Sequence, residues 1–234
     1  CIVVFLGVWN GAGVYATVPP NTASSEQLDR YLSQYAPYTM EYDASKLSDK
    51  DRAILRKLVK ASELLHEAYW QQTSIEGRKY LDQLRDAAPG SHGAKLRTLL
   101  ERNGGPFEQL NNHVAFMGSD TYYPGQEFYP KAMTAQQFDR YFNTLSDVDK
   151  KAFMDPYTVI RKGQKGTYKA VPFSQAYAPF LAPVITLLHE AAELSDNDSF
   201  KHFLRQKAKA LSTDKYYDAD VAWIDLKDSR FDIV

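Results

Sequence analysis

The sequence predicts a mainly α protein, a helical and bundle-like lobe that carries a small β-hairpin. Apolar residues recur at helical spacing in several long segments, and Ser, Thr and Asp stand where those segments begin. Strict alternation is found around one glycine-containing turn. A chain of 234 residues is long enough for one large domain or two small lobes with a substantial core.

The helices can be placed in order along the chain. Ser24 and Ser25 predict the start of a short helix that ends before Pro37. Residues 48–51, Ser-Asp-Lys-Asp, form an acidic variant of the capping box and begin a long helix. The apolar stripe expected on that helix consists of Ile54, Leu55, Leu58, Val59, Leu64, Leu65 and Tyr69. Further helices are predicted over residues 75–87, 92–103, 134–145, 174–194, 199–211 and 213–227.

Two segments do not follow this helical pattern. Residues 106–132 are rich in aromatic side chains and have no clear period, which predicts a long loop of the kind that often carries function. Residues 157–173 alternate around Gly163-Gln164-Lys165-Gly166, which predicts the β-hairpin.

The N-terminus predicts a truncated export signal over residues 1–16, a linker over 17–24 and the helical lobe over 25–234. The apolar start is too short to cross a bilayer, and it ends in small residues at Ala16. We therefore expect a periplasmic or envelope-associated protein, with a cytoplasmic one as the alternative. A lipid-modified Cys1 and a buried strand are competing interpretations, whereas Val18-Pro19-Pro20 excludes a nucleotide-binding glycine turn that opens a helix.

Composition excludes several classes of function. The formal net charge of −1 gives no basic excess, so we expect no nucleic-acid partner. A single cysteine, Cys1, excludes an internal disulfide framework and a cysteine-based zinc finger.

Residues 187–194, "LLHEAAEL", begin like the zinc-protease helix HExxH but have a glutamate in place of the second histidine. His189 and Glu193 are four residues apart and could face one ion. A catalytic zinc needs a third protein ligand, and the neighbouring sequence offers none. The surrounding leucines and alanines indicate a core-facing helix, with His189 at its edge and Glu190 and Glu193 in solvent.

The other candidates are weaker. The histidines His66, beside Glu67, His92 and His202 are scattered, and the pairs Asp218/Asp220 and Asp225/Asp228 are typical of solvated helix faces. The run Asn111-Asn112-His113 is expected to be held by side-chain hydrogen bonds rather than to line a cleft. There is no GxSxG, P-loop or reactive cysteine motif. From the residues alone, we therefore predict no catalytic, cofactor-binding or metal-binding residue in this chain.

A resemblance to a known family adds to this reading. Residues 211–234, "LSTDKYYDADVAWIDLKDSRFDIV", resemble the bacterial branch of the dipeptidyl peptidase III family of zinc metallopeptidases. The segments "ASKLSDKDRAIL", "EAYWQQ", "FYPKAMTAQQFD", "YTVIRKGQKGTYKAVPFSQAY" and "LLHEAAELSDNDSFKHFL" resemble that branch in the same order. The similarity covers about residues 38–234.

The resemblance implies that the chain is the N-terminal portion of a longer zinc-dependent exopeptidase. In that family the HExxGH-type zinc helix and its glutamate ligand come later than the segment that matches this chain. Zinc is accordingly expected in the intact protein and not in this fragment, which by itself is expected to be inactive. The expected partners are a peptide substrate and the C-terminal half of the same chain, with no stable membrane span.

Trp223 and Asp225 are the residues that we expect to line a substrate cleft, because the resemblance places them just before a substrate-handling strand. Helix packing by Trp223 and simple exposure of Asp225 are the alternatives. A different class of function is an exported, non-enzymatic helical domain that binds a partner through its aromatic loop.

Overall fold

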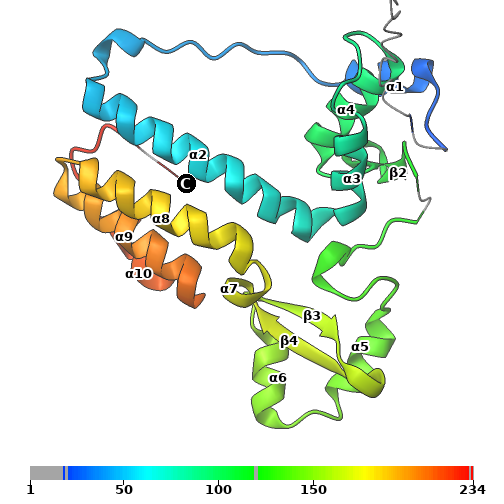
Figure 1. Cartoon of the computed structure of the whole chain (residues 1–234). Helices are drawn as coiled ribbons and strands as arrows, with labels where there is room; N and C mark the ends of the chain where they lie inside the picture. Colours follow the sequence, from blue (N-terminus) through cyan, green and yellow to red (C-terminus); the bar gives the residue numbers. More distant parts are fainter. Residues whose placement is uncertain (1–17, 19–20, 119–120, 232, 234) are drawn as a thin grey trace, which may run out of the picture. The chain divides into compact units, whose positions relative to one another are not determined.

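The computed structural model describes residue 18 and residues 21–118, 121–231 and 233. The expected export signal over residues 1–16 lies outside them. The chain divides into two compact units. Unit 1 contains the residues up to Tyr35 together with Glu76–Thr121, and unit 2 contains Ala36–Ile75 and Tyr122–Val234. The predicted fold class is confirmed, because the described chain is mainly helical with small two-stranded sheets (Figure 1).

Unit 1 is built around helix α4 (His92–Asn103), which packs against α1 (Ser25–Leu32). Ser24 begins α1 through a capping box with Gln27, as its position predicted. Helix α3 (Ile75–Gln83) precedes α4, and Gly104, at φ 62°, ends α4 in the left-handed conformation that glycine adopts readily. The fully or almost fully buried large apolar side chains of this unit are Leu28, Leu84, Leu96, Leu99, Leu100, Phe116 and Met117.

The predicted linker contributes to unit 1. Thr22 forms an antiparallel bridge with Met117, the Ala23 N–H donates to the Phe116 carbonyl at 2.9 Å, and the Gly118 N–H donates to the Asn21 carbonyl at 3.0 Å. Residues 21–23 are thus part of the ordered unit.

The predicted aromatic loop over residues 106–132 is not one irregular segment. Its first half forms a short antiparallel pair, β1 (Phe107–Glu108) with β2 (Val114–Ala115), around the 3-10 turn η2 (Gln109–Asn111), in unit 1. Its second half contains the 3-10 turn η3 (Gln126–Phe128) and belongs to unit 2. Alternation over such short strands is too brief to be recognised in the sequence.

Unit 2 contains the long helix α2 (Asp49–Thr73), which packs against α8 (Ala178–Leu194). Helix α9 (Asp198–Thr213) packs against α8, and α10 (Tyr217–Ile224) packs against α9. The predicted helix over residues 174–194 is interrupted at Tyr177, which separates α7 (Phe173–Ala176) from α8.

The buried face of α2 follows the helical period but is narrower than predicted. Ile54, Ala61 and Ala68 are buried, and Leu58 and Leu64 pack against the same core. Three predicted members of the stripe, Val59, Leu65 and Tyr69, are instead exposed. The apolar stripe predicted for α2 did not include its buried alanines, Ala61 and Ala68. These small side chains allow α8 to pack closely against α2.

The predicted hairpin is present as β3 (Thr158–Lys162) and β4 (Tyr168–Pro172), paired in antiparallel register with Ile160 opposite Ala170. Val159 and Ile160 are buried. The hairpin is preceded by α5 (Ala135–Phe142) and α6 (Asp147–Met154), and α6 was not predicted. Figure 1 shows α6 lying next to the strands, which it contacts.

Candidate functional site

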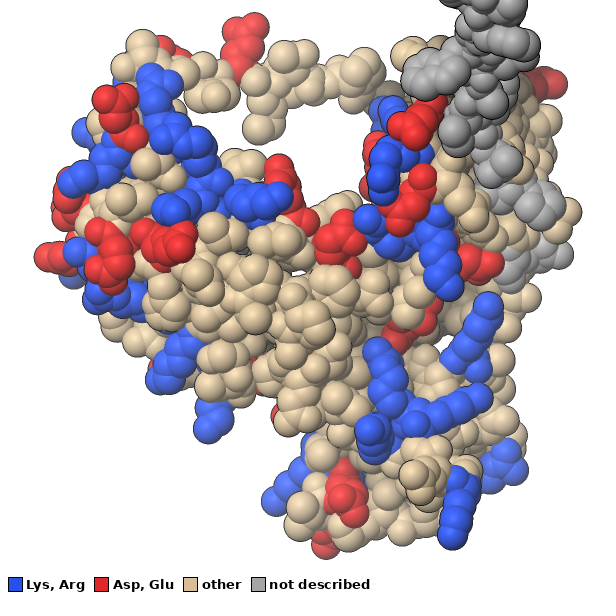
Figure 2. Space-filling view, viewed as in Figure 1, with Lys and Arg blue, Asp and Glu red and all other residues tan. Residues whose placement is uncertain are grey.

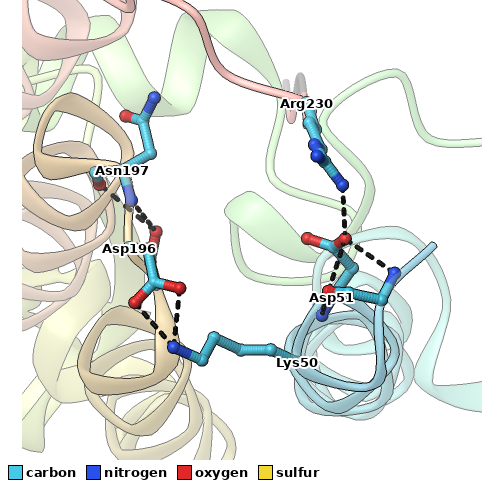
Figure 3. Close-up of polar contacts among 7 residues, drawn as sticks. Lys50, Asp51, Asp196, Asn197 and Arg230 are labelled. Carbon is cyan, nitrogen blue, oxygen red and sulfur yellow. Dashed lines mark hydrogen bonds and ion pairs between the residues drawn. The ribbon is translucent and has the colours of Figure 1, made fainter. Parts of the chain in front are cut away.

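A polar pocket of about 350 Å³ lies in unit 2 where the first turn of α2, the connection from α8 to α9 and residues 228–231 meet (Figure 3). Among the cavities of the described residues, it has the most charged side chains in its wall, which makes it the candidate functional site.

The Asp51 carboxylate is the most heavily engaged group of this pocket. Its Oδ2 atom accepts hydrogen bonds from the Ser48 N–H at 2.9 Å, from the Ser48 hydroxyl at 2.7 Å and from Arg230 Nη1 at 2.9 Å. The hydrogen bond from the Ser48 hydroxyl contributes most to lowering the pKa of Asp51 below its ordinary value. The Ser48 N–H and the nearby Arg230 lower it further. Asp51 therefore stays ionised as an anchor and is a poor proton acceptor.

The second charged pair joins α2 to the start of α9. Lys50 Nζ lies 2.6 Å from both oxygens of Asp196. The next residue, Asn197, caps α9 by accepting a hydrogen bond from the Phe200 N–H at 2.8 Å, and its amide donates to the Lys227 carbonyl at 2.8 Å. Figure 3 shows the two ion pairs on opposite sides of the pocket.

These contacts hold residues 227–231 against the helices. The Ser199 hydroxyl donates to the Lys227 carbonyl at 3.0 Å and accepts from the Lys227 N–H at 3.0 Å. The Phe231 ring packs on Phe200, with ring centroids 5.7 Å apart. Because Asp51 and Asp196 are both paired with cations, the pocket is suited to fixing this segment rather than to proton transfer.

Residues 187–194 form the last two turns of α8, and one face of this segment packs into the core. Leu188, Ala191 and Ala192 are buried in the core of unit 2, whereas His189 is exposed. Glu190 pairs with Lys57 at 2.6 Å, and Glu193 pairs with Arg205 at 2.6 Å. Arg205 lowers the pKa of Glu193, so this carboxylate already has a cationic partner.

Two other histidines, His66 and His92, form hydrogen bonds within the fold. His66 Nε2 accepts a hydrogen bond from the indole N–H of the buried Trp70 at 3.0 Å. The His92 ring bonds to the hydroxyls of Thr22 and Ser25 at 3.2 and 2.9 Å. His202 is exposed on α9. Within the described ranges, no group of three or more His, Cys, Asp or Glu side chains is arranged to hold a metal ion.

Residues 111–113 are held in place by a buried carboxylate that the sequence analysis did not single out. Glu108 is fully buried and accepts hydrogen bonds from the Tyr35 hydroxyl at 2.7 Å and from the Asn111 amide. Asn112 and His113 both have positive φ, at 52° and 57°. The expectation of a loop held by side-chain hydrogen bonds agrees with this arrangement.

Trp223 and Asp225 lie at the end of α10. Trp223 is 39% exposed and contributes to an open depression of about 410 Å³ together with Leu226 and Phe231. Asp225 is exposed beside it, at the C-cap of the helix. Their role at a substrate cleft stays a prediction.

The remaining carboxylates that the sequence singled out lie on the surface. Asp218 lies 3.3 Å from Lys209, across the contact between α10 and α9. Asp220 and Asp228 are exposed, and Asp228 has a positive φ of 51°. Arg230, Lys50 and Asp196 were missed, because their partners are far away in the sequence and nothing local marks them.

Comparison with known proteins shows a likeness to two solved peptidase structures. No protein-family profile matches the sequence. The solved structure of dipeptidyl peptidase III from Caldithrix abyssi is 32% identical, with a TM-score of 0.78, over 86% of this chain and 38% of that one. The solved dipeptidyl-peptidase III from Corallococcus sp. strain EGB is 28% identical, with a TM-score of 0.80, over 89% of this chain and 39% of that one.

A plant relative has the name of a different class of hydrolase. Nudix hydrolase 3 from Arabidopsis thaliana is 26% identical over an alignment 260 residues long. The alignment covers 90% of this chain and 34% of that protein. The chain thus spans about a third of this relative and less than two fifths of the two solved structures.

Fold and comparisons together define a helical, peptidase-like lobe. More specifically, the chain is a dipeptidyl peptidase III-like N-terminal portion, which confirms the resemblance predicted from its sequence.

Proposed function

We propose that this chain is the N-terminal lobe of a zinc-dependent exopeptidase resembling dipeptidyl peptidase III, which hydrolyses peptides in the intact protein. The observation that carries the proposal is the likeness to two bacterial dipeptidyl peptidases III over 86% and 89% of the chain, in sequence as well as in fold.

The described residues do not fit a zinc site. A catalytic zinc takes three protein ligands, and the described side chains offer no such group. His189 and Glu193, the nearest approach to a motif, lie on one helix, and Glu193 is bound by Arg205. We therefore propose that residues outside this chain bind the metal and cleave the peptide bond. The residues of this chain would position the substrate.

The segment held by the polar pocket is the part that we assign to positioning. Residues 227–231 are fixed to α2 through Arg230 and Asp51 and to α9 through Asn197 and Ser199. Trp223 precedes this segment in the sequence, and its side chain is partly exposed. We propose that Trp223 and Asp225 line the substrate cleft.

Export of the protein is part of the same proposal and rests on the apolar sequence before residue 17. No helix in the described part of the chain is long and apolar enough to cross a membrane. N-terminal sequencing of the secreted protein should find cleavage after Ala16. An uncleaved protein in the cytoplasm would contradict export.

The coding sequence that follows Val234 gives the most direct test of the proposed function. We expect it to encode an HExxGH-type helix, and a stop codon directly after Val234 would contradict the proposal. The protein encoded by the whole gene should release dipeptides from the N-termini of short peptides, measured by mass spectrometry. The 234-residue chain should release none.

A substitution tests whether Trp223 lines the substrate cleft, independently of whether the chain is a lobe of a peptidase. Trp223→Ala in the intact enzyme should raise KM or lower kcat/KM, with only a small change in the urea midpoint, because the side chain is partly exposed. Unchanged kinetics would remove Trp223 from the cleft but would leave the proposed peptidase activity in place.

A further inference from the structure

The β3–β4 hairpin has an unusual charge distribution for a chain with a net charge of −1. Residues 156–189 contain Arg161, Lys162, Lys165 and Lys169 but no Asp or Glu. All four cations lie between the middle of β3 and the start of β4. Figure 2 shows Lys and Arg side chains gathered over the part of the surface where Figure 1 places this hairpin and α5.

Among the described residues of unit 2, these cations have no carboxylate partner in an ion pair. The ion pairs of that part join Lys46, Lys50, Lys57, Lys60, Arg205, Lys209 and Arg230 to acidic residues. None of the ion pairs in the described ranges reaches Lys162, Lys165 or Lys169, and these three lysines are exposed. Arg161 differs, because its Nη1 donates to the Glu127 carbonyl at 2.8 Å and helps to hold the hairpin in place.

The register of the hairpin brings like charges together. Arg161 is directly opposite Lys169, and in such a pair the Cβ atoms are about 5 Å apart, where like charges repel. An anion bound beside the pair would relieve this repulsion. The uncompensated charge therefore points to a ligand of opposite sign.

The end of the hairpin is held in one conformation. The Gly163 N–H donates to the Thr167 carbonyl at 2.8 Å, and the Thr167 hydroxyl donates to the Gln164 carbonyl at 2.7 Å. Lys165 between them has a positive φ of 51°. A partner would thus meet lysines on an ordered turn, at a low cost in chain entropy.

We propose that the β3–β4 hairpin is a docking surface for an acidic segment of a separate polypeptide. The complementary charge is three or four carboxylates close together. Duplex nucleic acid is a poor match, because its binders typically neutralise about 6–10 phosphates and this patch has few cations. A membrane surface is also a poor match, since the hairpin itself exposes no large apolar side chain strongly, although Val148 and Met154 are exposed on the neighbouring helix α6.

Fluorescence anisotropy with a labelled peptide of six glutamates, flanked by glycine and serine, tests the proposal on the 234-residue chain. The triple variant Lys162→Gln, Lys165→Gln, Lys169→Gln should bind this peptide about tenfold more weakly, because three exposed charge contacts of modest strength are lost. Binding should also weaken as sodium chloride is raised, since exposed charges are screened.

The matched control removes the same charge from lysines that have carboxylate partners, Lys46, Lys60 and Lys209. Its affinity should stay within about twofold of the unsubstituted chain, since these side chains already have partners. Equal weakening by both triple variants would mean that only net charge matters and would overturn the proposal. So would an unsubstituted chain that does not bind the peptide.

Two further probes test the class of partner. An oligouridine and vesicles containing phosphatidylserine should bind without dependence on the hairpin lysines. Tighter binding of either, lost in the hairpin triple variant, would assign the patch to phosphate and overturn the polypeptide assignment. None of these measurements involves peptide hydrolysis, so their failure would leave the proposed peptidase function untouched.

Discussion

Arg230 donates a hydrogen bond from Nη1 to Oδ2 of Asp51, 179 residues earlier in the chain, at 2.9 Å. The same oxygen closes the capping box of α2 by accepting from Ser48. One carboxylate oxygen therefore both begins a long helix and fixes the segment that follows α10. Local and long-range structure are coupled at this atom.

The coupling can be measured with a double-mutant cycle. Asp51→Ala should cost about 1–2 kcal/mol of unfolding free energy, because it removes the capping box as well as the ion pair. Arg230→Ala should cost at most about 1 kcal/mol, because its side chain is largely exposed and the pair is screened. Urea unfolding of the two single variants and the double variant should give costs that do not add. Strict additivity would show that the pair contributes nothing.

The raised pKa of Tyr216 predicts that the folded protein loses stability at high pH. Burial, Asp214 and the stacked Tyr157 raise its pKa to about 12. The neutral phenol then contributes stability that is fully present below about pH 10 and is lost as the pH rises towards 12. Tyr216→Phe should flatten this decline in urea-unfolding curves, and ultraviolet titration should lose one late-ionising tyrosine. The decline would not disappear, because burial and the hydrogen bond to Glu76 also raise the pKa of Tyr80 to about 12.

Two glycines with positive φ should respond differently to alanine. Gly118, at φ 72°, has no room for a Cβ, which would lie 2.3 Å from the Tyr80 hydroxyl oxygen. Gly90, at φ 75°, has open space around the same position. Gly90→Ala should cost about 1 kcal/mol from backbone strain alone, and Gly118→Ala about 3 kcal/mol. Equal losses in thermal or urea unfolding would mean that Tyr80 moves aside without cost.

The purified 234-residue chain should bind less than stoichiometric zinc. Glu193 is engaged by Arg205, and the described residues supply no third ligand near His189. Metal analysis by mass spectrometry should therefore give the same content for the chain and for its His189→Ala variant. Stoichiometric zinc that is lost on substitution of His189 would contradict the scaffold assignment of this helix.

Local signals in the sequence were sufficient for most helix starts. Ser48, Ser91 and Thr134 each accept a hydrogen bond from the first turn of a helix, and each stands at or beside a predicted start. Such caps depend on neighbouring residues only, so they can be read from one sequence. The paired strands β3 and β4 were predicted for the same reason.

Structure that depends on distant residues could not be predicted. Helix α6 was missed, although Ser146 caps it, because its one buried residue, Phe153, makes no recurring apolar stripe. The Glu108 site requires Tyr35, 73 residues away. The polar pocket is composed of three segments whose association no local pattern reveals. Most helices and the β3–β4 hairpin could therefore be predicted from local patterns, whereas α6 and the pairing of distant charges could not.

The interleaving of the two units has a consequence for how the chain folds during synthesis. Helix α2 buries its apolar face against α8, and Lys57 on α2 meets a partner, Glu190, 133 residues later. At typical translation rates that delay is on the order of 10 s. During that time unit 1 is being synthesised, and the apolar face of α2 has no native partner to pack against. Nascent chains should therefore depend on chaperones until α8 leaves the ribosome.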